Sequence, residues 1–76
     1  MEKILAILEE IRPDIDFKNE EELIDAGVLD SFDLAQIISE LNDEYDVHIR
    51  VTHLSPENFN SATKMQNLVQ TLKSES

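Results

Sequence analysis

Ser31 is the side chain whose setting in this sequence best suits chemistry. It ends a loop that holds the only glycine, Gly27, and begins an amphipathic run, with Asp30 before it and Asp33 two residues after it. The first turn of a helix offers unpaired backbone N–H groups and a partial positive charge, and both favour a phosphate group. Because Asp30 and Asp33 oppose this attraction, the site suits a phosphodiester attached covalently to Ser31 better than a free anion.

Two other roles compete for Ser31. A hydroxyl at a helix start can simply cap the helix, although Asp30 is able to make that cap. A catalytic serine needs a general base within hydrogen-bond reach. The two histidines, His48 and His53, lie beyond the far end of the predicted helix 31–46, which is roughly 22 Å long at about 1.5 Å per residue. We therefore assign no catalytic residue, expect no enzyme, and expect both histidines to be solvated loop residues.

The segment before the site is predicted to be one helix and a long connection. Apolar residues recur at helical spacing over 2–11, and the proline that follows ends the helix because the residue before a proline avoids the helical region. The connection, residues 12–29, is long for a small domain, and such loops are often functional. We expect a short turn at 20–24, where Leu23 and Ile24 anchor the loop to the core.

The second helix is predicted to run from Ser31 to about 46. Asp30 suits the N-cap position of this helix. Asp33, three residues on, would make a weaker form of the capping box. Apolar and polar residues then alternate over 47–51, a run too short for a strand without a partner. We expect an extended segment in which Val47, Ile49 and Val51 contact the core.

Two further helices complete the pattern. Ser55 and Pro56 are typical of an N-cap and a first helical position, and they predict a short helix that ends at Phe59. Ser61 then caps a last helix, whose tail at 73–76 we expect to fray. The sequence predicts an all-α fold, a small four-helix bundle with a long first loop and a short third helix, in one domain. The predicted core lies on three helical stripes: Ile4, Leu5, Ile7, Leu8 and Ile11; Leu34, Ile37, Ile38, Leu41 and Tyr45; Met65, Leu68, Val69 and Leu72.

This order of elements and the residues around Ser31 resemble the acyl carrier protein family. The resemblance covers almost the whole chain. It rests on the Asp30-Ser31 pair before a large apolar residue, on the core of the second helix, on the segment 44–46 that ends this helix, and on the segment 56–59 that leads into the last helix. In that family the serine carries a 4′-phosphopantetheine arm whose thiol holds a thioester cargo. The resemblance implies that a phosphopantetheinyl transferase attaches this arm to Ser31 from coenzyme A. It also implies that Asp30 helps to hold magnesium in the transfer complex, so we expect no metal site in the free protein.

Details of the motif leave the cargo open. Phe32 replaces the leucine that usually follows the serine, and Arg50 stands where proline is often found, which weakens an assignment to fatty-acid synthesis. The run at 27–31, together with 39–41 and 46–47, is also similar to the D-alanyl carrier branch, in which an adenylating enzyme loads an amino acid onto the arm. Fatty acyl and aminoacyl cargoes both remain open.

Acidic residues surround the proposed attachment point. From 20 to 46 the chain holds ten carboxylates and neither lysine nor arginine. Such a tract can be a solvated face or a docking surface for enzymes with basic patches. We favour docking, because the tract surrounds Ser31 and the family presents its second helix to partners. The residues expected to contact partners lie on or beside this helix: Asp30, Phe32, Asp33, Ala35, Ser39, Glu40, Asp43 and Glu44.

Phe32 has two possible environments. At about 100° per residue it points nearly opposite the apolar stripe of its helix, so it would face solvent beside Ser31. A large exposed aromatic side chain suggests a contact with a partner. Alternatively, the helix start tilts and Phe32 packs on the long loop.

Composition excludes several classes of protein. The net charge of −11 disfavours nucleic acid, whose phosphates need lysine and arginine. The chain has no cysteine, so the thiol of any thioester must belong to an attached group. The longest apolar run, 4–8, is far too short to span a membrane, and we see no signal peptide, so we expect a cytoplasmic protein. The acidic residues over 14–25 loosely resemble the spacing of a calcium-binding loop. We expect no calcium site there, because Lys18 takes a ligand position and Asn19 replaces the required glycine.

Together these inferences predict a free-standing acyl or aminoacyl carrier protein, monomeric and without catalytic activity of its own. Its partners would be a phosphopantetheinyl transferase, an adenylating or acyl-loading enzyme, and a downstream acyl transferase or synthase. The alternative is an acidic, carrier-like interaction module that docks to a basic partner and is never modified.

Overall fold

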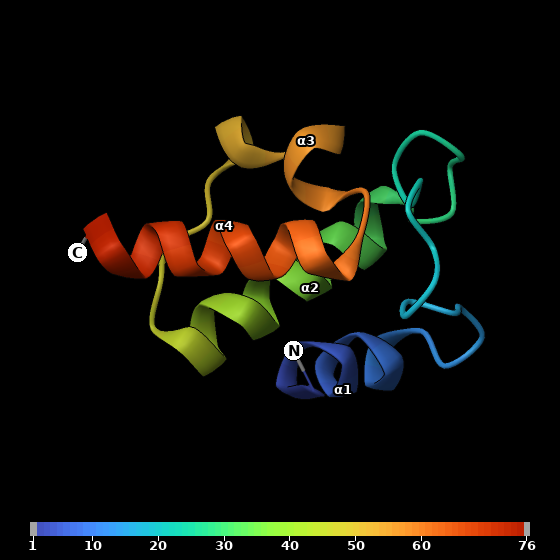
Figure 1. The fold of residues 1–76 in the computed structure, drawn as a ribbon, viewed down its shortest axis with the longest axis horizontal. Helices are drawn as coiled ribbons and strands as arrows, with labels where there is room; N and C mark the ends of the chain where they lie inside the picture. The colour runs from blue at the N-terminus through green and yellow to red at the C-terminus, as the bar shows by residue number, and fades with distance from the viewer. Residues whose placement is uncertain (1, 76) are drawn as a thin grey trace.

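The fold is a small bundle of four α-helices, as the sequence predicts (Figure 1). The computed structural model describes residues 2–75, and this range contains no β-strand. Helix α2 packs against α1 and α4, α1 also contacts α4, and α3 lies on α4. Within the described range, no helix is both long and apolar enough to cross a membrane. The elements in chain order are α1 (Glu2–Ile11), α2 (Ser31–Tyr45), the short 3₁₀ helix η1 (Val51–His53), α3 (Pro56–Phe59) and α4 (Ala62–Glu75).

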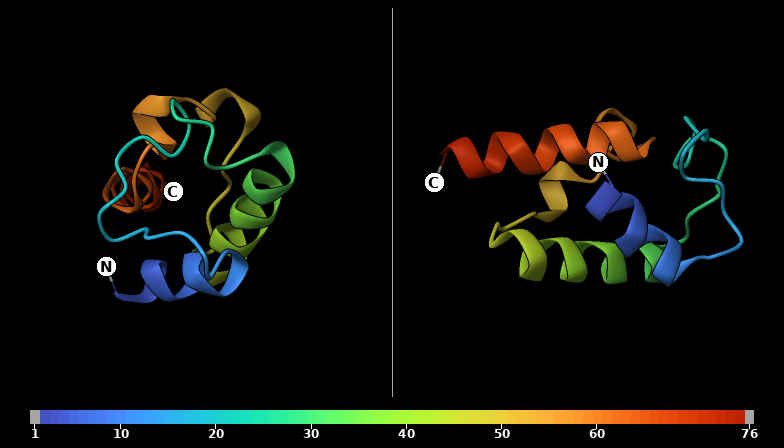
Figure 2. Two further views of the ribbon diagram at one scale, coloured as in Figure 1. Left: turned by 90° about the vertical axis from the view of Figure 1, so that its right-hand side faces the viewer. Right: turned by 60° about the horizontal axis from the view of Figure 1, so that its bottom comes forward.

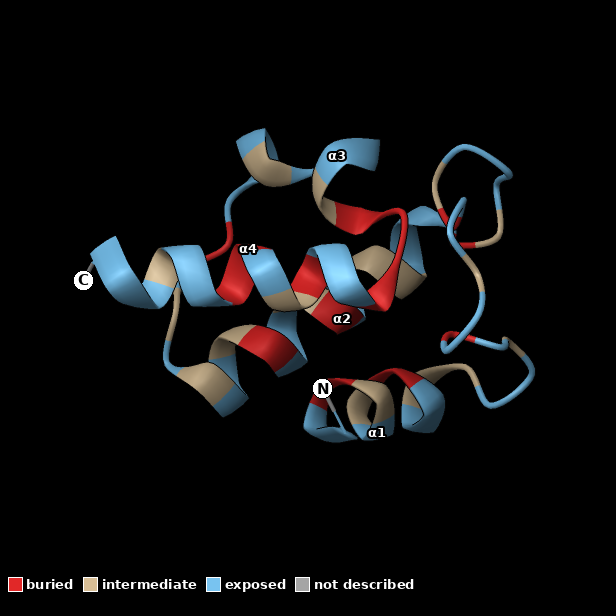
Figure 3. Ribbon diagram, in the orientation of Figure 1, coloured by how far each residue is buried: buried red, intermediate tan, exposed pale blue. Residues whose placement is uncertain are grey.

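The helices surround one hydrophobic core, and the long first loop crosses the end of the bundle on its way from α1 to α2 (Figure 2). The buried faces of the helices turn inward, while their outer faces are exposed (Figure 3). The three predicted stripes are confirmed, with their central residues buried and their flanking residues half-buried. The buried stripe residues are Ile4 and Leu8 on α1, Ile37 and Leu41 on α2, and Met65, Leu68 and Val69 on α4.

The first loop contributes more to the core than the sequence pattern predicts. Leu23 is fully buried, as expected, but Phe17 and Leu29 are buried as well. The turn lies at 23–27, slightly later than the predicted 20–24. Gly27 has a φ of 67°, a left-handed conformation that glycine adopts without strain, and this explains where the turn forms.

The segment after α2 differs from the expected extended segment at one residue. Val47 is half-buried and Ile49 is buried, as predicted, but Val51 is 81% exposed. The chain turns into η1 there, because the His53 N–H donates to the Arg50 carbonyl oxygen at 2.9 Å and the Arg50 N–H donates to His53 Nδ1 at 2.9 Å. Val51 is therefore the first residue of η1 and no longer part of the extended segment.

Two helix ends also depart from expectation. Ser55 has the extended backbone of an N-cap residue, but its side chain makes no capping hydrogen bond within the described range. The tail does not fray through residue 75: α4 continues to Glu75, and Lys73 Nζ donates to the Tyr45 carbonyl oxygen at 3.2 Å. A cation in the last turn also suits the negative end of the helix dipole. Ser76 lies outside the described residues.

Candidate functional site

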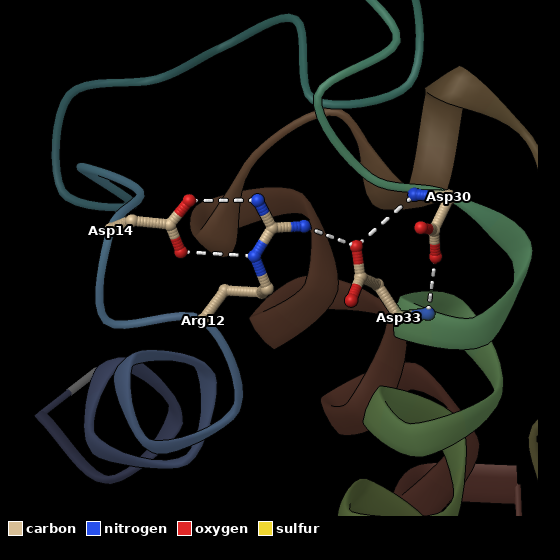
Figure 4. Close-up of polar contacts among 4 residues, drawn as sticks. All are labelled: Arg12, Asp14, Asp30 and Asp33. Atoms are coloured by element: carbon tan, nitrogen blue, oxygen red, sulfur yellow. Dashed lines mark hydrogen bonds and ion pairs between the residues drawn. The ribbon is translucent and has the colours of Figure 1, made fainter.

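Asp30 and Asp33 form a reciprocal capping box at the start of α2 (Figure 4). The Asp30 carboxylate accepts a hydrogen bond of 2.8 Å from the Asp33 N–H, and the Asp33 carboxylate accepts one of 3.2 Å from the Asp30 N–H. Each carboxylate satisfies a backbone donor that the helix cannot, so the two residues together fix where α2 begins.

Ser31 is the first residue of α2, and it is exposed. Because Asp30 supplies the cap, the Ser31 hydroxyl is not needed to hold the helix start. Because Ser31 is exposed, a phosphodiester on its Oγ would displace no core side chain, and the first-turn N–H groups would offset part of its charge. The site therefore fits a covalently attached phosphate-linked arm.

Arg12 ties the site to the end of α1 (Figure 4). Its Nε and Nη2 donate to the two oxygens of Asp14 at 2.9 and 2.8 Å, and its Nη1 donates to Asp33 Oδ2. The hydrogen bonds that Arg12 donates hold the pKa of the Asp14 carboxyl below its ordinary value. The Asp33 side chain is only 13% exposed, so its carboxylate is directed to Arg12 rather than to solvent. The expected contact of Asp33 with partners stays a prediction, while within this chain its carboxylate contacts Arg12 and the Asp30 N–H.

Asn60 holds the loop that leads to Ser31. Its Oδ1 accepts hydrogen bonds from the backbone N–H groups of Ile24 and Asp25, at 2.9 and 3.1 Å. Its carbonyl oxygen accepts one from the Leu23 N–H at 3.0 Å. One residue at the α3–α4 junction, through its side chain and its backbone carbonyl, therefore fixes the loop turn. Sequence reasoning missed this residue, and its one local signal is that asparagine in a turn bonds readily to backbone groups.

The exposed face of α2 carries most of the residues predicted to dock partners. Glu44 is also exposed, but its carboxylate is already paired with a cation of the same chain. It lies 3.0 Å from Lys3 Nζ, and the Glu44 side chain is 44% exposed. This contact raises the pKa of Lys3, chiefly through the hydrogen bond to Glu44. The other exposed positions that were predicted to contact partners are Asp30, Phe32, Ala35, Ser39, Glu40 and Asp43.

Phe32 is 84% exposed, so the alternative in which it packs on the loop is wrong. It follows Ser31 directly in the first turn of α2. A large aromatic side chain that remains in water beside the proposed attachment point has no role in the core, and its exposure is consistent with a contact surface.

Both histidines follow the end of α2, but the expectation of solvated loop residues holds only for His48, because His53 ends the 3₁₀ helix η1. His48 is exposed, and His53 is half-buried with its Nδ1 engaged by the Arg50 backbone N–H. Both line a surface groove of about 530 Å³ between the segment after α2 and the end of α4. In residues 2–75, no group of three or more histidine, cysteine, aspartate or glutamate side chains is placed to hold a metal ion.

Comparison with known proteins shows what this chain is similar to. Residues 2–71 match the protein family described as "Phosphopantetheine attachment site". The D-alanyl carrier protein of Streptococcus suis (strain 05ZYH33) is 37% identical over 65 residues, which cover 84% of this chain and 82% of that protein. The D-alanyl carrier protein of Streptococcus sanguinis (strain SK36) is 33% identical over 64 residues, which cover 83% of this chain and 81% of that protein.

Proposed function

Since the chain belongs to the phosphopantetheine-attachment family and carries 4′-phosphopantetheine as its covalent cofactor, we propose that Ser31 is the residue to which this arm is attached. The observation that carries the proposal is that Ser31 is exposed at the first residue of α2, beside a cap that Asp30 and Asp33 make without it. The chain then acts as a carrier and leaves the chemistry on the cargo to other proteins.

Attachment is a simple transfer to oxygen. The Ser31 Oγ–H gives up its proton to a base of the transferase, and Oγ forms a phosphoester bond to the pantetheine phosphate of coenzyme A. The bond to adenosine 3′,5′-bisphosphate breaks, and that group leaves. The chain has no cysteine, so the arm supplies the thiol that the thioester needs.

Mass spectrometry of the intact protein tests the proposal. Incubation with coenzyme A, magnesium and a broad-specificity phosphopantetheinyl transferase should add one arm per chain. Ser31→Ala should abolish the addition, while Ser74→Ala, which changes an exposed serine of α4, should leave it unchanged. An arm on another residue would overturn the assignment of Ser31. No addition with several transferases would favour the alternative, an unmodified module that docks to a basic partner.

For the cargo, we propose an amino acid, with D-alanine as the first candidate. The names of the relatives and the run at 27–31 support this choice. An adenylating enzyme would activate the amino acid with ATP and pass it to the arm thiol. The arm-bearing protein should gain the mass of one D-alanyl group with such an enzyme, and hydroxylamine should release it. Loading by a fatty acyl ligase alone would overturn the cargo and leave the attachment proposal intact.

For the docking surface, we propose the exposed face of α2 beside Ser31. Phe32 offers an apolar contact, and Glu40 and Asp43 offer negative charge to enzymes with basic patches. The transferase and the loading enzyme would approach this face, and with coenzyme A and ATP as their co-substrates we expect the reactions to take place in the cytoplasm.

A further inference from the structure

The first turn of α2 has an electrostatic problem that the arm makes worse. Asp30 and Asp33 already place two carboxylates around Ser31. A phosphodiester on Ser31 adds a third negative charge to the same turn. At such short separations like charges repel even in partly solvated surroundings, so a cation in contact with this turn lowers the cost of the attachment.

Arg12 is the cation that the structure brings to this turn (Figure 4). It follows the last residue of α1, and its backbone N–H still donates to the Leu8 carbonyl oxygen at 2.9 Å. Its side chain reaches across to Asp33 Oδ2, the same oxygen that accepts the Asp30 N–H. One atom of Asp33 therefore joins Arg12 to the capping box that surrounds Ser31.

The shape of the guanidinium explains why one residue can do this. Asp14 accepts the hydrogen bonds from Nε and Nη2, on one edge of the planar guanidinium. Nη1, which those two bonds leave free, donates to Asp33. A lysine has a single point charge and cannot hold both carboxylates in this planar arrangement. Two other cations, Lys3 and Lys73, have contacts with Glu44 and Tyr45 near the opposite end of α2.

We propose that Arg12 is a positioning residue for the modification of Ser31: it offsets part of the Asp33 charge, keeps the capping box closed, and so permits a phosphodiester in the first turn of α2. The inference rests on the proposed attachment at Ser31. It adds a determinant just after α1, outside the attachment motif, that acts through Asp33.

Four proteins test the assignment: the native chain, Arg12→Gln, Asp33→Asn, and the double variant. The rate of modification is measured with coenzyme A, magnesium and a broad-specificity transferase. Arg12→Gln should lower kcat/KM about two- to fivefold, the range expected for a solvent-accessible ion pair. Asp33→Asn should restore the rate of Arg12→Gln, because it removes the charge that Arg12 partly offset while the asparagine oxygen can still accept the Asp30 N–H.

A second measurement separates this role from a merely structural one. Attachment of the arm should lower the melting temperature of Arg12→Gln more than that of the native chain, and the double variant should behave like the native chain. Arg12→Lys keeps the charge without the fork and should react at an intermediate rate, which keeps the test valid if Arg12→Gln folds poorly.

The controls distinguish this inference from the function on which it rests. Lys18→Gln removes the same charge from an exposed loop position and should leave the rate unchanged. An equal effect of Lys18→Gln, or no rescue by Asp33→Asn, would overturn the role of Arg12 while Ser31 remained the attachment site. Failure of the native chain to accept the arm at Ser31 would instead overturn the proposed function.

Discussion

Asn60 and Asp25 lie 35 residues apart in the sequence, and Asn60 Nδ2 donates a hydrogen bond of 2.9 Å to Asp25 Oδ2. The same side chain accepts from the backbone N–H groups of Ile24 and Asp25 through its Oδ1. The α3–α4 junction and the loop before Ser31 are therefore held by one buried amide. This relationship makes Asn60 a distant determinant of where Ser31 lies.

Asn60→Ala should lower the free energy of unfolding by roughly 1–3 kcal/mol, since it leaves part-buried backbone donors without an acceptor. Urea unfolding measures the loss, and amide hydrogen exchange should become faster at residues 24 and 25. Asn67→Ala on the exposed face of α4 is the matched control and should change stability by less than about 0.5 kcal/mol. Equal effects of the two substitutions would show that the Asn60 contacts do not stabilise the loop.

Asp46→Gly should stabilise the protein by about 0.5–1 kcal/mol. Asp46 ends α2 with a φ of 53°, a left-handed conformation that is strained for an aspartate and easy for a glycine. Its negative charge also lies at the negative end of the helix dipole. Asp46→Asn removes only the charge, so thermal or urea unfolding of both variants separates the two causes. A loss of stability in Asp46→Gly would mean that added freedom of the unfolded chain outweighs the relief of strain.

Asp43→Lys should slow modification or loading, mainly through a weaker encounter with the enzyme, and the loss should shrink at high salt. Glu9→Lys on α1 makes the same change in net charge and should matter less. Phe32→Ala should slow the same reactions with little dependence on salt, because its contribution would be apolar burial. Rates that fall equally for Asp43→Lys and Glu9→Lys would mean that the acidity is only a solvated face. Asp33→Lys is unsuitable for this test, because it would break the capping box and the ion pair with Arg12.

The pair of Arg12 and Asp14 should be visible in the acid stability of the protein. The hydrogen bond from Arg12 holds the Asp14 pKa below its ordinary value of 3.8. A carboxyl whose pKa is lower in the folded state contributes stability that is present above its unfolded pKa and is lost as the pH falls through its folded pKa. The native chain should therefore be more stable than Asp14→Asn above pH 3.8, and the two should converge at lower pH. Parallel curves from urea unfolding across this range would contradict the linkage.

The sequence by itself determined the helices and the loop-to-helix junction at Ser31, because their signals are local. The Asp30 cap with Asp33 three residues on places the start of α2, and Ser61 places the start of α4, where its Oγ accepts the Lys64 N–H at 3.1 Å. A capping box and a helical stripe involve residues within one or two turns of each other, so the order of residues contains the whole interaction.

Only the tertiary structure decided which distant groups hold that junction in place. Phe17 is buried in a loop without periodicity, Asn60 bonds to residues 35 and 36 positions away, and Arg12 reaches Asp33 across 21 positions. Arginine and asparagine side chains can bond to many partners, and the choice among those partners depends on how α1, the loop and the α3–α4 junction pack together. The exposure of Phe32 was decided in the same way, because helical periodicity gives a direction from the axis but not what lies in that direction.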